Sequence, residues 1–150
     1  MRTRFPLTIA VAFAIGAVGT TSAGTEQNKK PSISIRANPP VGFSPLRVVL
    51  TAELKGGTND YEEFYCPTVE WEWGDDTRSE NTADCDPYEP GKSEIKRRYI
   101  MEHTFRADST DISGAPTGPT QFRVRFLLKQ KRKVVGSGQT IIELRAGSSE

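Results

Sequence analysis

The chain has 150 residues, the length of one domain, and its 20 basic residues against 19 acidic ones leave it nearly neutral. This balance excludes a histone-like nucleic-acid binder and a polyanionic tail protein. One histidine and two cysteines leave little material for a zinc site or a histidine-based catalytic centre.

The N-terminal segment has the three parts of a secretory signal. Arg2 and Arg4 are basic, residues 5–18 are almost continuously apolar, and small residues follow up to Ala23. The apolar run of about 14 residues is shorter than the ~20 that a membrane-spanning helix needs. We therefore expect cleavage after Ala23 rather than an uncleaved anchor, a secreted or periplasmic location, and no stable membrane insertion afterwards.

The remainder of the chain is predicted to form short strands. Residues 24–31 are polar and are expected to be a disordered lead-in, residues 32–146 the folded domain, and residues 147–150 a tail. Apolar and polar residues alternate in runs separated by turn residues, which is typical of half-buried antiparallel strands. Strands are expected at residues 32–36, 46–53, 68–73, 95–105, 121–128 and 134–144. Without a run at helical spacing, this pattern predicts an all-β, antiparallel two-sheet sandwich.

The two cysteines fit an exported domain. Cys66 and Cys85 are the only pair, and a secreted protein meets an oxidising environment, so we expect a disulfide between them. The bridge would close a loop of about 20 residues and stabilise the fold by roughly 3 kcal/mol. Two free reactive thiols are the alternative, but Asp84 and Asp86 flank Cys85 and would oppose thiolate formation.

One motif carries a family resemblance. Val69-Glu70-Trp71-Glu72-Trp73-Gly74-Asp75-Asp76-Thr77 resembles the Trp-x-Phe-Gly-Asp-Gly signature of PKD (polycystic kidney disease) domains. Residues 37–42 and 45–48 resemble that family's first strand, its turn and its second strand. His103-Thr104-Phe105 resembles its His-Thr-Tyr, and residues 121–126 resemble its Tyr-x-Val-x-Leu strand. The resemblance covers roughly residues 32–146 and implies an immunoglobulin-like β-sandwich.

The motif residues have structural roles of their own. Trp71 and Trp73 are two positions apart, so both face one side of a strand and would bury a large apolar area. A ligand-stacking tryptophan platform is the alternative. Gly74 can adopt a positive φ at the strand end, and Asp75 can accept hydrogen bonds from turn amides. Asp76 stands where the family has a second glycine, which leaves the turn geometry open.

The departures from the family pattern lie in loops, at residues 57–66, 79–94 and 106–120. Such loops are where sandwich domains commonly place function. Four aromatic residues lie close to the cysteines in the sequence: Tyr61, Phe64, Tyr65 and Tyr88. They form either a small satellite core around the disulfide or a recognition patch, since tyrosine is enriched at binding surfaces.

Acidic loop residues raise the question of calcium. Asp75, Asp76, Asp84 and Asp86 are weak candidates for the oxygen ligands that Ca²⁺ prefers. No loop has the spacing of an EF-hand. We therefore expect no metal and no cofactor.

His103 and the basic run from Lys129 to Lys133 have ordinary structural explanations. His103 and Phe105 are expected to pack in the fold, and no nucleophile is visible that would make His103 catalytic. The basic run is predicted to be a charged hairpin turn; contact with an anionic polymer is the alternative. Aromatic residues do not interleave with it, so binding of nucleic acid is not expected.

Charge is unevenly distributed along the chain. Residues 59–94 hold 12 acids and two bases, and residues 95–150 hold 11 bases and five acids. These charges either pair across neighbouring strands or create a dipolar surface that orients a partner.

These observations predict a non-catalytic exported module. We expect it to bind an extracellular or envelope protein through the disulfide-tied loops. The alternative is a carbohydrate-binding module that uses Tyr61, Tyr65 or Tyr88. A hydrolase would need two catalytic carboxylates at a fixed separation, and the sequence does not indicate such a pair.

Overall fold

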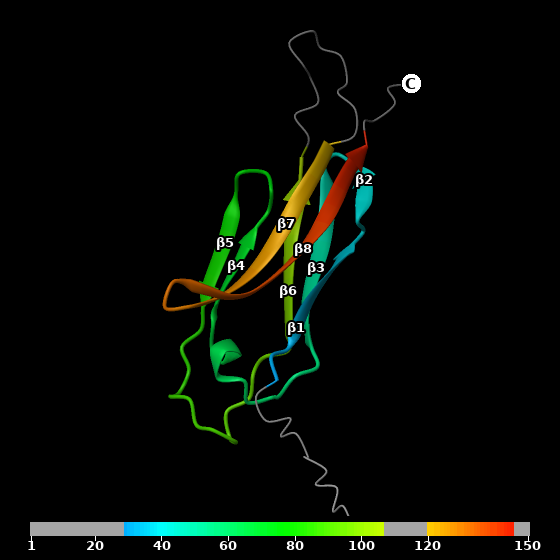
Figure 1. Ribbon diagram of the computed structural model, residues 1–150. Coiled ribbons are helices and arrows are strands. Elements are labelled where there is room, and N and C mark those ends of the chain that lie inside the picture. The colour runs from blue at the N-terminus through cyan, green and yellow to red at the C-terminus, as the bar shows by residue number, and fades with distance from the viewer. Residues whose placement is uncertain (1–28, 107–119, 146–150) are drawn as a thin grey trace, which may run out of the picture.

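The computed structural model describes residues 29–106 and 120–145, which form two β-sheets packed into a sandwich (Figure 1). The predicted signal peptide, most of the lead-in, the 106–120 loop apart from its two end residues, and the tail lie outside the described residues. Within the described ranges, no helix is long and apolar enough to cross a membrane.

One sheet has three strands and the other has five. The first has the order β1-β3-β6 and is antiparallel throughout: β1 (Ser32–Asn38), β3 (Leu46–Lys55) and β6 (Arg98–Phe105). The second has the order β2-β8-β7-β4-β5: β2 (Val41–Phe43), β8 (Lys133–Arg145), β7 (Thr120–Gln130), β4 (Thr68–Glu72) and β5 (Arg78–Thr82). Only the short β2 runs parallel to its neighbour, β8. A 3-10 turn, η1 (Glu62–Phe64), precedes β4.

The core lies between the sheets, as the alternating pattern predicts. Every second residue of β3 and of β7 is buried, and their facing side chains meet in one hydrophobic cluster. Trp71 and Trp73 form its centre: the two indoles stack on each other, and Trp71 contacts Phe126 at a ring distance of 4.7 Å. The all-β, two-sheet prediction is therefore confirmed.

Three short elements were not predicted, for two physical reasons. β5 has the sequence Arg-Ser-Glu-Asn-Thr and is an edge strand whose residues are mostly exposed, so it has no apolar alternation. β2 has three residues and η1 has three, and elements this short carry no detectable period. β2 follows Pro39-Pro40, where the chain leaves the first sheet and joins the second.

The predicted boundary between the lead-in and the folded domain, at residue 32, is wrong by three residues. The backbone N–H of Thr58 donates to the carbonyl of Lys29 at 3.0 Å, and the Lys30 ammonium donates to the carbonyl of Val135 at 2.6 Å. Pro31 is buried. Residues 29–31, expected to be disordered, are therefore held against the domain.

Gly136 of β8 lies at an irregularity in the pairing of β8 with β7, and packing explains why a glycine stands there. Leu128 pairs with Gly136 and Lys129 with Val134, so Val135 is an extra residue at this point of β8. A Cβ on Gly136 would lie 2.8 Å from the ring of Phe64. β8 therefore has a bulge at Val135, beside a glycine that lets a core ring approach the strand.

Opposite charges pair on the outer face of the five-stranded sheet. Arg125 of β7 contacts Glu72 of β4 at 2.9 Å, and Lys129 contacts Glu70 on the same two strands. Part of the acidic and basic excess therefore pairs in space. Glu70 alternates with the inward-facing Trp71 and so points outward, yet it is only 3% exposed.

Candidate binding site

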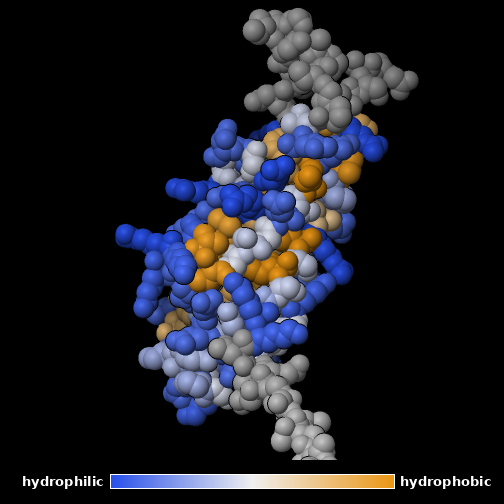
Figure 2. All heavy atoms as spheres, in the orientation of Figure 1, coloured by the Kyte–Doolittle hydropathy of each residue, from blue (hydrophilic) through white to orange (hydrophobic). Residues whose placement is uncertain are grey.

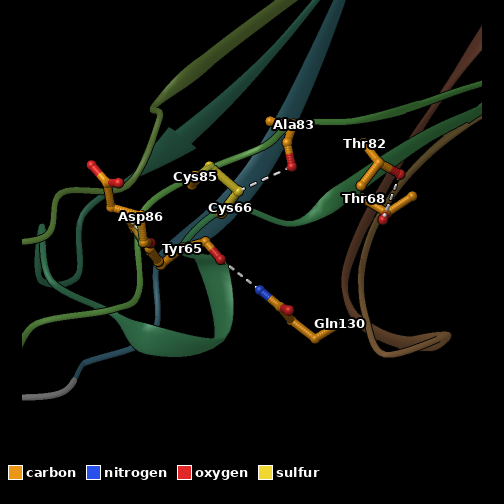
Figure 3. Close-up of a disulfide and its surroundings, with 8 residues drawn as sticks. All are labelled: Tyr65, Cys66, Thr68, Thr82, Ala83, Cys85, Asp86 and Gln130. Atoms are coloured by element: carbon orange, nitrogen blue, oxygen red, sulfur yellow. Dashed lines mark hydrogen bonds between the residues drawn. A yellow bond between two sulfur atoms is a disulfide. The ribbon is translucent and has the colours of Figure 1, made fainter.

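A disulfide braces the loops at one end of the sandwich. Cys66 and Cys85 are bonded, with their Cα atoms 6.2 Å apart, as predicted. Figure 3 shows that the bridge joins the segment after η1 to the segment after β5. Tyr65 extends this brace in two directions: its carbonyl accepts a hydrogen bond from the Gln130 side chain at 2.6 Å, and its hydroxyl donates to the carbonyl of Asp86 at 3.0 Å.

The four aromatic residues of these loops divide between core and surface. Phe64 is 0% exposed and belongs to the main core, so its side chain offers no contact area to a partner. Tyr61 packs edge-to-face on Phe64, with ring centroids 5.1 Å apart. Tyr65 and Tyr88 contact each other at 5.6 Å. Tyr61, Tyr65 and Tyr88 are partly exposed. The loops thus combine one buried ring, that of Phe64, with three tyrosine rings that a partner can reach.

An open hollow of about 690 Å³ lies between Tyr61 and Tyr88. Its acidic lining residues are Asp60, Glu62 and Glu63, and Pro90 and Gly91 complete it. The Tyr88 hydroxyl donates to the carbonyl of Asp60 at 2.6 Å, which fixes the ring against the opposite loop.

The carboxylates act electrostatically on both phenols. Desolvation raises the pKa of Tyr61, and the charge and hydrogen bond of Glu63 raise it further. Desolvation also raises the pKa of Tyr88, together with the charges of Asp60 and Glu62. The hollow therefore places two phenols with raised pKa values beside acidic side chains.

A second cavity, of about 360 Å³, lies between β6 and the β4–β5 hairpin. The disulfide, Val69, Trp71 and Met101 are among its walls. Tyr99 also lines it, and the hydroxyl of this 8% exposed residue has no hydrogen-bond partner within the described part of the chain. Burial raises the pKa of Tyr99 to about 12. Sequence analysis missed this cavity, and the available signal was a tyrosine at an inward position of β6.

The motif residues form a hydrogen-bonded turn beneath the core. Gly74 has a φ of 80°, and the Asp75 carboxylate accepts from the Thr77 backbone N–H at 3.1 Å. His103 bonds the other Asp75 oxygen at 2.7 Å and stacks on Trp73 at 4.3 Å, with the planes 2° apart. Phe105 is fully buried beside them.

The remaining candidates are not among the residues that line the two cavities. Across residues 29–106 and 120–145, the histidine, cysteine and acidic side chains form no group of three that could hold a metal ion, and Asp75, Asp76, Asp84 and Asp86 are included in that statement. The basic run is a hairpin turn, as predicted: Lys131 and Arg132 both have positive φ, the geometry of a two-residue primed turn.

No protein-family model matches the chain, and no curated protein matches it.

Proposed function

We propose that the chain is a non-catalytic, exported PKD-like module that binds a protein partner through its disulfide-braced loops. The observation that carries the proposal is the open hollow between Tyr61 and Tyr88. Tyrosine offers a large amphipathic contact area and is enriched at interfaces. The negative charges that line the hollow complement a partner surface that presents lysine or arginine.

The turn after β4 supports the PKD-type, immunoglobulin-like assignment. Asp76 replaces a glycine of the family signature, yet it adopts a φ of 62°, the left-handed conformation that glycine favours. His103 and Asp75 come from two separate parts of the resemblance and are hydrogen bonded to each other. A family-type turn therefore fits this sequence despite the substitution.

The disulfide supports the proposed export. Structural disulfides persist in oxidising compartments and are rare in reducing ones. The pairing of Cys66 with Cys85 leaves no free cysteine among the described residues. It agrees with the secretory signal predicted for residues 1–23.

A capture experiment tests the proposal. Immobilised residues 24–150 are exposed to an envelope extract of the source organism, either untreated, protease-treated or digested with glycosidases. We expect a specific component to be retained, protease to abolish its retention, and Tyr61→Ala with Tyr88→Ala to weaken it at least tenfold. Arg36→Ala, exposed on β1 of the other sheet, is the control. Retention that the tyrosine variants leave unchanged would contradict the proposed site.

Carbohydrate binding is the second candidate, and the same hollow favours it. Aromatic rings next to carboxylates can stack on a sugar ring and accept hydrogen bonds from its hydroxyls. Retention that survives protease, fails after glycosidase digestion and depends on Tyr61 and Tyr88 would establish this candidate instead.

A further inference from the structure

The two sheets differ in width, and this leaves one strand edge uncovered. β6 is the last strand of the three-stranded sheet, and no strand within the described residues pairs with its other edge. The five-stranded sheet extends further on this side, where Figure 1 shows the β4–β5 hairpin projecting from the molecule. The gap where a fourth strand would lie contains the cavity lined by β4, β5 and β6.

The backbone of β6 points alternate polar groups into this gap. The N–H of Leu54 donates to the carbonyl of Arg97 at 2.8 Å, so Arg97 faces β3. Bonding direction alternates along an antiparallel ladder. Arg98, Ile100 and Glu102 therefore direct their backbone N–H and C=O groups towards the open edge.

The cavity contains one buried polar group that no atom of the described residues satisfies, the hydroxyl of Tyr99. Its walls include the apolar side chains of Val69, Trp71 and Met101, and its polar lining residues include Asn81, Glu94 and Lys96. The hydroxyl of Tyr99 is buried there without a partner, and an unsatisfied buried hydroxyl costs free energy that an incoming acceptor would recover. Its volume of about 360 Å³ is within the range of ligand pockets.

We infer that this gap is a docking site for an extended segment of the partner protein, which adds as an antiparallel strand to the open edge of β6 and places one large side chain in the cavity. The inference rests on the proposed function, because it gives the protein partner a second contact. Main-chain hydrogen bonds give such strand addition its affinity, and pockets for alternate side chains give its specificity. We expect the added segment to run antiparallel to β6, as β3 does on the other edge of β6. Antiparallel pairing is slightly more stable per residue than parallel pairing.

The outer face of β6 specifies the chemistry of the segment. Ile100 is 58% exposed, and Arg98 has no ion-pair partner among the described residues, whereas Glu102 is already held by Arg47 at 2.7 Å. An antiparallel strand would thus carry an apolar residue opposite Ile100 and an acidic residue opposite Arg98. The residue between these two lies opposite Tyr99, faces the cavity, and is expected to be large, mainly apolar and able to accept a hydrogen bond.

A peptide library tests this inference. Residues 24–150 are screened against soluble nine-residue peptides that hold valine at position 4 and glutamate at position 6, with position 5 varied over all residues. We expect selection of a large residue with an acceptor, such as tyrosine, at position 5. The selected peptide should slow amide hydrogen exchange at Arg98, Ile100 and Glu102.

Three variants and two controls make the result specific. Tyr99→Phe removes only the hydroxyl and should weaken the selected peptide roughly tenfold, the value of one buried hydrogen bond. Ile100→Thr and the cavity-filling Ala83→Phe should also weaken it. Val49→Thr changes an exposed apolar residue of β3 on the same face and should not. A peptide with proline at position 4, which cannot donate to the ladder, should not bind.

The outcomes separate this inference from the proposed function. The inference is overturned if no peptide is selected, if exchange slows elsewhere than in β6, or if only small apolar compounds enter the cavity. If that happens while Tyr61→Ala with Tyr88→Ala still abolishes partner capture, the proposed function stands without strand addition. If Ile100→Thr weakens capture and the tyrosine variants do not, β6 is the only docking site.

Discussion

Asp75 is the residue on which the turn after β4 depends. Its carboxylate joins Thr77, two positions along the chain, to His103 on the other sheet. Burial alone would raise the pKa of Asp75, but the hydrogen bonds from Thr77 and His103 outweigh it and hold the pKa below its ordinary value of 3.8. The charged form of Asp75 is therefore stabilised in the folded state.

This lowered pKa predicts how acid destabilises the protein. The contribution of Asp75 is complete above the unfolded pKa of about 3.8 and is lost as the pH falls through the folded pKa. We expect the free energy of unfolding to fall below pH 4, and to fall less steeply in Asp75→Asn, as measured by urea denaturation between pH 3 and 6. Asp76→Asn removes the neighbouring charge but none of these hydrogen bonds, so its pH profile should follow that of the natural protein.

The burial of Glu70 predicts that removing its partner Lys129 alone destabilises the fold more than replacing both residues. The hydrogen bond from Lys129 lowers the pKa of Glu70 against the opposing effect of desolvation. Lys129→Met leaves a buried carboxylate unpaired and should cost about 1–3 kcal/mol of unfolding free energy. Adding Glu70→Gln should recover part of this loss.

The neighbouring pair on the same strands is the control for Lys129→Met. Arg125 and Glu72 are half exposed, so Arg125→Met should cost about 0–1 kcal/mol. Equal losses in Lys129→Met and Arg125→Met, measured by urea denaturation, would show that the burial of Glu70 has no energetic consequence.

At the scale of the elements, β8 shows how close packing shapes a strand. Its bulge at Val135 and the bare Gly136 admit the ring of Phe64 from η1. Gly136→Ala would place a methyl group 2.8 Å from that ring and from the Ile33 side chain. Overpacking of this kind costs about 1–3 kcal/mol, which thermal unfolding would detect. Ser137→Ala, at the exposed next position, should change the melting temperature little.

A strand that buries one face could be predicted from the sequence. A strand that is exposed on both faces could not be predicted. The predicted boundaries of the strand that contains Trp71 differ from those of β4 by one residue, because its inward residues are apolar and its outward residues charged. β5 lies beside β4 but exposes nearly all of its residues, so nothing in Arg78–Thr82 distinguishes it from a loop.

The site was less predictable than the fold, for a related reason. The sequence drew attention to Tyr61 and Tyr88 because they lie near the cysteines in a loop. Tyr99 lies in a strand, and only the pairing of the sheets shows that its hydroxyl lacks a partner. A cavity between strands that are far apart in sequence depends on long-range packing, which no local pattern encodes.

At the scale of the whole molecule, the disulfide is the covalent link between two loops at one end of the sandwich. Cys66→Ser with Cys85→Ser should lower the free energy of unfolding by roughly 3 kcal/mol, because the unfolded chain regains the freedom of the closed loop. Denaturation of this variant should match that of the natural protein after reduction. A loss well below 1 kcal/mol would mean that Tyr65 and Tyr88 brace the loops without the bridge.

The crossing of the chain from β1 to β2 has a mechanical consequence. β2 runs parallel to β8, so pulling residue 29 away from residue 145 slides these two strands past each other along their length. Their backbone hydrogen bonds lie across the pulling direction and bear the load together instead of opening one after another. Because residue 29 leads first into β1, a tension applied through the ends of the domain would load the seven-residue pairing of β1 with β3 as well as the pairing of Val41–Phe43 with β8.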